Sequence, residues 1–254
     1  MAAFRCGAVS DKGDIRTENQ DSVLWTTGIL EGDEAALCLV ADGMGGLSYG
    51  AQVSGYIAER FEGFWREDLP EMVRAGRGAQ SDLRELLEQE IWDINQEILR
   101  FRRQAQCRCG STLSLLLLYR GDYYIENMGD SRVYLFRQGR LLKLTQDQSL
   151  AAQMEREGRL SRKEEAGLEH ILTMCLGMFE APKSYFAGGR LKKGDLFLLC
   201  SDGLYRCLAQ SQMEQVLRQK GLTAGERAEE LRRLVEPGRG QDNISAVVAE
   251  VLRA

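Results

Sequence analysis

The sequence predicts an α+β fold, with a central sandwich of two mainly antiparallel β-sheets flanked by pairs of helices. Two observations predict it: strand-length apolar runs are separated by helix-length amphipathic segments, and short strands with glycine-bearing links follow one another mid-chain. No Pro-, Gly- or Ser-rich tract divides the 254 residues, of which 44% are hydrophobic and 28% charged. We therefore expect a single domain over residues 1–254.

The first part of the chain predicts one buried strand and two helices. Residues 35–41 form a continuous apolar run of strand length, which indicates burial on both faces. Residues 50–65 carry apolar side chains at three- and four-residue spacing, the pattern of an amphipathic helix. Residues 81–101 give the clearest helical stripe, and Ser81 is a suitable N-cap. The charged residues 66–80 are expected to link these two helices.

The rest of the chain predicts strands first and then a mixture of helices and strands. Residues 112–144 indicate an antiparallel meander, because short strands are joined by turns around Gly121 and Gly139. Residues 154–170 are highly charged and interrupted by glycines, so we expect a partly helical surface excursion. A core strand, two helices and a final strand are then predicted at residues 195–200, 211–219, 225–235 and 244–252.

Charge and cysteine usage limit the classes of function. The net charge of −5 is spread without any block of Lys or Arg, which disfavours a nucleic-acid partner. The N-terminus lacks the apolar core of a signal peptide, and the longest apolar run, residues 113–119, is too short to span a bilayer. Seven scattered cysteines indicate reduced thiols, so we expect a cytoplasmic protein with no membrane partner. Zinc is disfavoured, because the pair Cys107 and Cys109 has no second ligand pair.

Aspartates recur at the ends of predicted strands, and this pattern points to chemistry. An ionised carboxylate at the edge of a core is unfavourable unless it is paired or bound to metal. Basic residues near these aspartates in sequence are few, apart from Arg16 and Arg132. Oxygen ligands favour Mg²⁺ or Mn²⁺ over softer metals. The aspartates that share this placement are Asp21, Asp42, Asp130, Asp202 and Asp242.

A turn interpretation competes with the metal interpretation for each aspartate taken alone. Asp-Gly is the strongest short hairpin signal, and Asp often caps helices. However, Asp42-Gly43 and Asp202-Gly203 are each followed by helix-like sequence instead of a returning strand. The two glycines would also let the backbone approach an ion closely. The five positions together therefore favour a metal site.

Eight short motifs resemble, in the same order, those of the metal-dependent protein phosphatase 2C family, bacterial branch. They include Asn19-Gln20-Asp21, Asp42-Gly43-Met44-Gly45-Gly46 and Ser201-Asp202-Gly203-Leu204. The resemblance implies hydrolysis of phosphoserine and phosphothreonine in proteins by a metal-bridging hydroxide, without a phosphoenzyme. The full set lies at residues 13–21, 40–46, 110–112, 127–132, 144–147, 172–177, 200–204 and 241–244.

The resemblance also implies a ligand set for two Mn²⁺ or Mg²⁺ ions, and it allows a third. Asp42 matches the aspartate that bridges the two ions, and the Gly43 carbonyl matches a further ligand. Asp202 and Asp242 match ligands of one ion, whereas Asp21 matches a ligand on the side of the other. These correspondences make Asp42 the first catalytic candidate in the chain.

Two further positions complete the implied site. Asp130 matches the aspartate that helps to hold a third, weaker ion in this family. Arg16 matches the arginine that grips the substrate phosphate and is the second catalytic candidate, because a guanidinium fork suits two phosphate oxygens. The implied partners are phosphorylated proteins and a cognate Ser/Thr kinase, and we expect a monomer.

Four features depart from the family pattern or stay open. Met44 stands where eukaryotic members carry a histidine that is thought to protonate the leaving group. Gln20 stands where many relatives have glutamate. The only histidine, His170, lies far along the chain beside apolar residues, so a catalytic role for it is not the favoured interpretation. The charged region at about residues 149–170 falls where the family has its flap, which suggests a role in substrate choice.

Two rival functions remain as alternatives. Cys200 and Arg206 have the C-x-x-G-x-x-R spacing of cysteine-dependent phosphatases, in which a thiolate attacks phosphorus. Against this alternative, Asp202 would repel a phosphate dianion inside such a loop. The other alternative is a catalytically inactive scaffold that binds phosphoproteins. Such proteins usually lose metal-site aspartates, and all the expected ones are present here.

Overall fold

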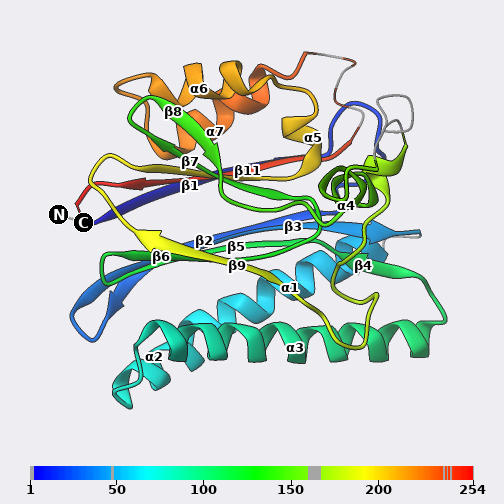
Figure 1. Ribbon diagram of the computed structural model, residues 1–254, viewed down its shortest axis with the longest axis horizontal. Coiled ribbons are helices and arrows are strands. Elements are labelled where there is room, and N and C mark those ends of the chain that lie inside the picture. The colour runs from blue at the N-terminus through cyan, green and yellow to red at the C-terminus, as the bar shows by residue number, and fades with distance from the viewer. Residues whose placement is uncertain are drawn as a thin grey trace.

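Two antiparallel sheets pack face to face, and helices cover both outer faces of this sandwich (Figure 1). The structure is a computed structural model that describes residues 3–46, 49–159, 167–236, 238, 240 and 242–253. Each layer of helices buries its apolar stripe against one sheet, and the sheets bury their inner faces against each other. The predicted sandwich of two sheets flanked by helices is confirmed.

One sheet contains five strands among the described residues, and all neighbouring strands pair antiparallel. Helices α5 (Asp202–Tyr205), α6 (Gln210–Arg218) and α7 (Ala224–Arg233) lie on its outer face (Figure 1). The last strand of the described chain, β11, lies between β1 and β10. The strand order is β1 (Phe4–Asp11), β11 (Ile244–Val251), β10 (Leu196–Cys200), β7 (Arg132–Arg137) and β8 (Arg140–Lys143).

The other sheet contains six strands within the same described ranges. Helices α1 (Tyr49–Arg66), α2 (Asp68–Arg74) and α3 (Gln80–Ala105) cover its outer face (Figure 1). A short strand, β4 (Cys109–Ser111), pairs with the end of β3 and lies off the main order. The main order is β2 (Asp21–Leu30), β3 (Asp33–Gly45), β5 (Leu113–Tyr119), β6 (Asp122–Met128) and β9 (Tyr185–Arg190).

Strand β3 is buried on both faces, as its continuous apolar run predicts. Leu37 and Leu39 pack into the core between this sheet and its helices. Cys38 and Val40 point the opposite way, into the core between the two sheets, where they share a cluster with Phe197. All five side chains are fully buried. Because side chains alternate along a strand, one segment contributes to two cores at once.

The two predicted hairpins are confirmed, but the single meander is wrong. Arg120 and Gly121 join β5 to β6 with φ of 49° and 75°, and Gln138 and Gly139 join β7 to β8 with φ of 54° and 77°. Two consecutive residues with positive φ are typical of the turns that connect adjacent strands. Between the hairpins, however, the chain crosses from one sheet to the other at Gly129, which has a φ of 94°.

The predicted helices are confirmed, with local corrections. Ser81 is not the N-cap of α3, because the helix begins at Gln80, and the Asp82 carboxylate accepts the Ala79 N–H at 3.1 Å. The charged linker before α3 contains an unpredicted short helix, α2, with Pro70 in its first turn. Pro is tolerated there because the first turn leaves its N–H groups unpaired. Within the described residues, none of the helices is long and apolar enough to cross a membrane.

The charged excursion after β8 is helical at both described ends. Helix α4 (Leu150–Arg156) begins earlier than predicted, and Ser149 caps it by accepting the Ala152 N–H at 3.3 Å. A 3₁₀ helix, η1 (Leu168–His170), lies where the excursion returns. The Leu150 N–H donates to the Ile171 carbonyl at 2.7 Å, which ties the two ends together. The segment 160–166 of the predicted flap lies outside the described residues.

One carboxylate is buried in the fold where the favourable influences of Ser184 and Arg84 do not offset the cost of burial. Glu126 in β6 is fully buried, and neither of its carboxylate oxygens has a hydrogen-bond partner among the described residues. Burial raises the pKa of Glu126 from 4.5 to about 7, because an apolar environment disfavours the charged form. The folded chain therefore retains a proton that the unfolded chain releases above pH 4.5.

Glu126→Gln should remove this pH dependence. Below pH 4.5 the carboxyl is protonated in both states, and its contribution to stability is lost as pH rises through about 7. We expect the native chain to lose about 3 kcal/mol of its free energy of unfolding, relative to the variant, between pH 4.5 and pH 8. Urea unfolding at both pH values measures this. Glu229→Gln, at an exposed position of α7, should show no growth, and a flat difference for Glu126→Gln would contradict the prediction.

Candidate metal centre

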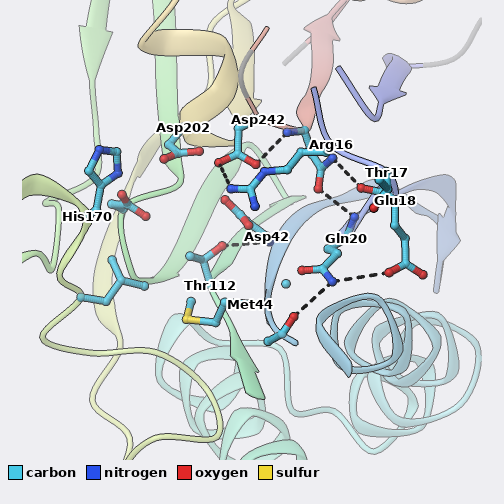
Figure 2. Close-up of a pocket in the computed structure, with 15 residues that line it drawn as sticks. Arg16, Thr17, Glu18, Gln20, Asp42, Met44, Thr112, His170, Asp202 and Asp242 are labelled. Carbon is cyan, nitrogen blue, oxygen red and sulfur yellow. Dashed lines mark hydrogen bonds and ion pairs between the residues drawn. The ribbon is translucent and has the colours of Figure 1, made fainter. Parts of the chain in front are cut away.

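A pocket of about 500 Å³ lies at one end of the sandwich and takes residues from both sheets. Figure 2 shows Asp42, Asp202 and Asp242 turned toward one another, with Arg16 beside Asp242. The predicted site residues that line this pocket are Arg16, Asp42, Gly43, Asp130, Asp202 and Asp242. The remaining predicted residue, Asp21, is next to Asp42 in the pairing of β2 with β3.

Asp42 is held within β3 and does not follow it, which corrects the expected strand end. The strand continues to Gly45 and pairs with β4. The Asp42 N–H donates to Thr112 Oγ1 at 3.0 Å, and the Thr112 N–H donates to the Asp42 carbonyl at 2.9 Å. Ser111 Oγ donates to the same carbonyl at 3.0 Å. These bonds fix the main chain of Asp42, so its side chain is the part left to act in the pocket.

Asp202 and Asp242 flank adjacent strands of the other sheet. Asp202 is the first residue of α5, just after β10, and Asp242 directly precedes Asn243 and β11. Because β10 and β11 pair antiparallel, the end of one strand meets the start of the other. Arg16 Nη2 lies 2.8 Å from Asp242 Oδ2, so the arginine is already at the carboxylates. Strand pairing therefore gathers residues that are far apart in sequence.

The structure gives Gly43 and Gly203 a packing role that the sequence analysis did not predict. A Cβ added at Gly43 would lie 2.2 Å from the Gly50 carbonyl oxygen and 2.5 Å from that of Gln20. A Cβ at Gly203 would lie 2.1 Å from the Asn243 carbonyl oxygen. Real Cβ atoms do not approach backbone oxygens this closely. The glycines thus permit close packing of backbone segments around the pocket.

Asn243 organises the loop that carries Arg16, a role that the sequence analysis missed. Its Nδ2 donates to the carbonyls of Lys12 and Glu18, both at 2.9 Å, and its Oδ1 accepts the Gln20 N–H at 2.8 Å. The side chain is buried. The only signal in the sequence is its position directly after Asp242. Asn243 therefore couples the Arg16 loop to the Asp242 segment.

Asp21 has the least satisfied carboxylate near the pocket. It is buried, and its Oδ2 accepts a hydrogen bond from Ser201 Oγ at 2.8 Å. Its Oδ1 is buried without a hydrogen-bond partner among the described residues. Burial raises the pKa of Asp21 to about 7, and the nearby Asp202 adds to the effect. An unpaired carboxylate oxygen at this place is suited to a cation.

The basic partners of the carboxylates differ from those expected. Arg132 does not pair with Asp130, because its guanidinium binds Asp147 at 2.7 and 3.1 Å. Instead, Arg206 Nε lies 2.9 Å from Asp202 Oδ2, and Arg206 Nη2 lies 3.4 Å from Asp130 Oδ2. The pair of Arg206 with Asp130 could not be predicted, because the two residues are far apart in sequence. The pair of Arg206 with Asp202 could have been predicted, because residues four apart in a helix lie side by side. Burial, followed by the charge of Asp202, raises the pKa of Asp130 to about 6.

The carboxylates exceed their cationic partners, and this imbalance falls on Asp42. Burial raises the pKa of Asp42 well above its ordinary value, and the charges of Asp21 and Asp202 raise it further. Divalent cations would offset both the cost of burying the Asp42 charge and its repulsion by Asp21 and Asp202. The donor atoms are all oxygens, which Mg²⁺ and Mn²⁺ prefer. Among the described residues, no group of three or more His, Cys, Asp or Glu side chains is arranged to hold a metal ion by itself. Ions in this pocket would therefore also need main-chain oxygens or water as ligands, and Mg²⁺ usually keeps several waters.

The other candidates named from the sequence have clear positions. Cys200 is fully buried in β10, and burial raises the pKa of its thiol to about 12, so it cannot serve as a thiolate nucleophile. Arg206, its supposed phosphate-binding partner, is engaged with carboxylates. The cysteine-dependent alternative is therefore wrong. Met44 and His170 both line the pocket, and His170 Nε2 lies 3.6 Å from Glu169 Oε1.

Comparison with known proteins gives concordant results. A family model described as "Protein phosphatase 2C" matches residues 15–236. The serine/threonine phosphatase stp of Listeria monocytogenes serotype 4b (strain F2365) is 28% identical over 246 residues, which cover 95% of this chain and 93% of that protein. The catalytic domain of the protein phosphatase PstP, solved with two manganese ions, superposes with a TM-score of 0.81 at 27% identity, covering 98% of each chain. The S. agalactiae serine/threonine phosphatase has the same fold, with a TM-score of 0.85 at 24% identity over 98% of this chain and 99% of that one.

Asn243→Ala should loosen the loop that carries Arg16. It deletes three hydrogen bonds to main-chain groups of that loop, so the free energy of unfolding should fall by about 1–3 kcal/mol. Hydrogen exchange of the Gln20 amide should become much faster than in the native chain. Gln153→Ala, which removes only a bond to Glu157 within α4, is the control and should leave this amide unaffected. Unchanged protection of Gln20 would show that Asn243 does not hold the loop.

Proposed function

The chain belongs to the protein phosphatase 2C family, and on that basis we propose that the pocket at the end of the sandwich is its phosphatase centre. The protein is a metal-dependent enzyme that hydrolyses phosphoserine and phosphothreonine in proteins. One observation carries the assignment of the site: Asp42, in a strand of one sheet, lines the same pocket as Asp202 and Asp242, which flank strands of the other sheet. Carboxylates in such a cluster are stable together only with cations.

The resemblance to the family supplies the ligand assignment, and the positions of the side chains support it. Asp42 and the Gly43 carbonyl would help to hold two Mn²⁺ or Mg²⁺ ions. Asp202 and Asp242 would hold one ion, and Asp21 would act on the side of the other, where its Oδ1 lacks a partner. When bound, two such ions supply a water-derived nucleophile at neutral pH and neutralise phosphate charge. The protein's own role is to keep these carboxylates ionised, fixed in position and partly shielded from water.

Arg16 is assigned to the substrate phosphate. Its side chain is 55% exposed, and it contacts Asp242 through Nη2. The remaining N–H groups of the guanidinium can therefore bind two phosphate oxygens while Asp242 orients the group. The Asn243 hydrogen bonds hold the Arg16 loop against the same segment. Arg16 thus aligns the phosphoryl group and offsets its charge as the bond to the Ser or Thr oxygen breaks.

The domain organisation, compartment, oligomeric state and partners of the enzyme are inferred in the same way. We infer a single catalytic domain over residues 1–254 that works as a cytoplasmic monomer, has no nucleic-acid or membrane partner, and opposes a cognate Ser/Thr kinase in signalling. The seven cysteines are free thiols, which supports a reducing compartment. The net charge of −5 supports the absence of a nucleic-acid partner. The region at about residues 149–170 is proposed to act as a flap beside the pocket, which His170 lines.

Asp42→Asn should abolish most of the activity while the fold persists. The amide cannot balance two cations, so kcat toward a phosphothreonine peptide with Mn²⁺ should fall by about 10²–10³-fold or more. A chelator should have the same effect on the native enzyme. Asp33→Asn, an exposed aspartate in the same strand, is the matched control and should keep native kcat. Retention of more than about a tenth of native kcat by Asp42→Asn would refute the assignment.

Arg16→Lys should weaken substrate binding more than it alters the metal centre. Lysine keeps the charge but loses the fork that binds two oxygens, so kcat/KM for the same peptide should drop by about 10-fold or more. Mn²⁺ binding, followed by calorimetry, should stay close to native. Arg5→Lys, at another exposed arginine paired with a carboxylate, serves as the control. An unchanged kcat/KM would rule out phosphate binding by Arg16.

A further inference from the structure

Arg206 places a permanent positive charge among three carboxylates at the edge of the pocket. Its Nε lies 2.9 Å from Asp202 Oδ2, its Nη2 lies 3.4 Å from Asp130 Oδ2, and its Nη1 lies 3.1 Å from Glu169 Oε1. These partners come from α5, from the crossing between β6 and β7, and from η1. The guanidinium of Arg206 therefore links three segments of the chain through ion pairs with one carboxylate from each.

The contacts of Arg206 hold its charge in place from several sides. Its Nη2 also donates to the Glu169 carbonyl at 3.3 Å, and its main-chain N–H donates to the Asp202 carbonyl at 3.0 Å. Tyr205 Oη donates to the same oxygen of Asp130, at 3.4 Å. The side chain of Arg206 is only 23% exposed, against 55% for Arg16. Arg206 is thus a fixed part of the wall, whereas Arg16 can turn toward a ligand.

Arg206 and Asp202 attract each other mainly through their opposite charges, and less through a hydrogen bond. Although Nε lies 2.9 Å from Asp202 Oδ2, it is buried without a well-directed hydrogen bond among the described residues. An arginine cannot lose its proton in a protein, so this charge is present at every working pH. The Arg206 side chain contacts Asp202 at Oδ2, which leaves Oδ1 for an ion held jointly with Asp242.

Arg206 occupies the place beside Asp130 and Asp202 where a third metal ion would be expected. An ion at Asp130 and Asp202 would compete for carboxylate oxygens that Arg206 already contacts, and it would lie close to a like charge in a partly buried place. We propose that Arg206 takes the place of a third metal ion as a built-in cation, so that the centre holds two ions only. This inference rests on the proposed two-ion centre and concerns its stoichiometry.

Metal counting tests the inference directly. Equilibrium dialysis against saturating Mn²⁺, followed by elemental analysis, should find two ions per native chain. Arg206→Gln removes the charge and should bind a third, weaker ion. Arg206→Lys keeps a cation and should stay at two. The double variant Arg206→Gln with Asp130→Asn should return to two, because the freed carboxylate is then absent. Arg190→Gln, which breaks an exposed pair with Asp122, is the matched control and should also bind two.

A second measurement does not depend on how Arg206 variants fold. Asp130→Asn in the otherwise native chain should still bind two ions, because Arg206 and not an ion neutralises Asp130. Loss of an ion in Asp130→Asn, or three ions in the native chain, would overturn the inference. Two ions in Arg206→Gln would overturn it as well, while leaving the two-ion centre intact. Fewer than two ions in the native chain would overturn the proposed centre together with this inference.

Discussion

Repulsion among carboxylates where the two sheets meet is the constraint on which the pocket depends. Asp42 lies in a strand of one sheet, and Asp202 and Asp242 flank strands of the other, so packing the sheets brings the charges together. Burial and these neighbours raise the pKa of Asp42 well above its ordinary value. Thr112 and Asn243 hold the main chain against this repulsion through hydrogen bonds to backbone groups. The clustered carboxylates thus destabilise this part of the fold when no cation is bound, and the same cluster is what attracts cations to the pocket.

The elements with strong local signals could be predicted from the sequence. The amphipathic stripes of α1 and α3 and the apolar run of β3 carry their own periodicity, and the hairpins at Gly121 and Gly139 carry their own turn chemistry. The site aspartates could be found for a similar reason, since a carboxylate directly beside a buried strand is rare without a partner. The family motifs then supplied roles that the pattern alone does not provide.

The remaining features depend on contacts between distant segments, which no local pattern records. Strand β9 contains Gly188 and Gly189 and gives no alternating signal, and the sheet to which each hairpin belongs is decided by packing alone. The role of Asn243 requires knowing that the Arg16 loop passes beside it. The pairing of Arg206 with Asp130 requires knowing that α5 faces the crossing after β6. Each of these is a long-range geometric fact that folding creates.

The place of β11 between β1 and β10 has a consequence for the making of the protein. Asp42 leaves the ribosome well before Asp242 and β11, which is the last of the described strands to be synthesised. Until that strand inserts, β1 and β10 are not joined and the five-stranded sheet is split. A nascent chain that stops before Asp242 therefore lacks one of the proposed metal ligands as well as the strand that joins the two parts of the sheet. The topology itself delays enzymatic competence until translation has supplied β11.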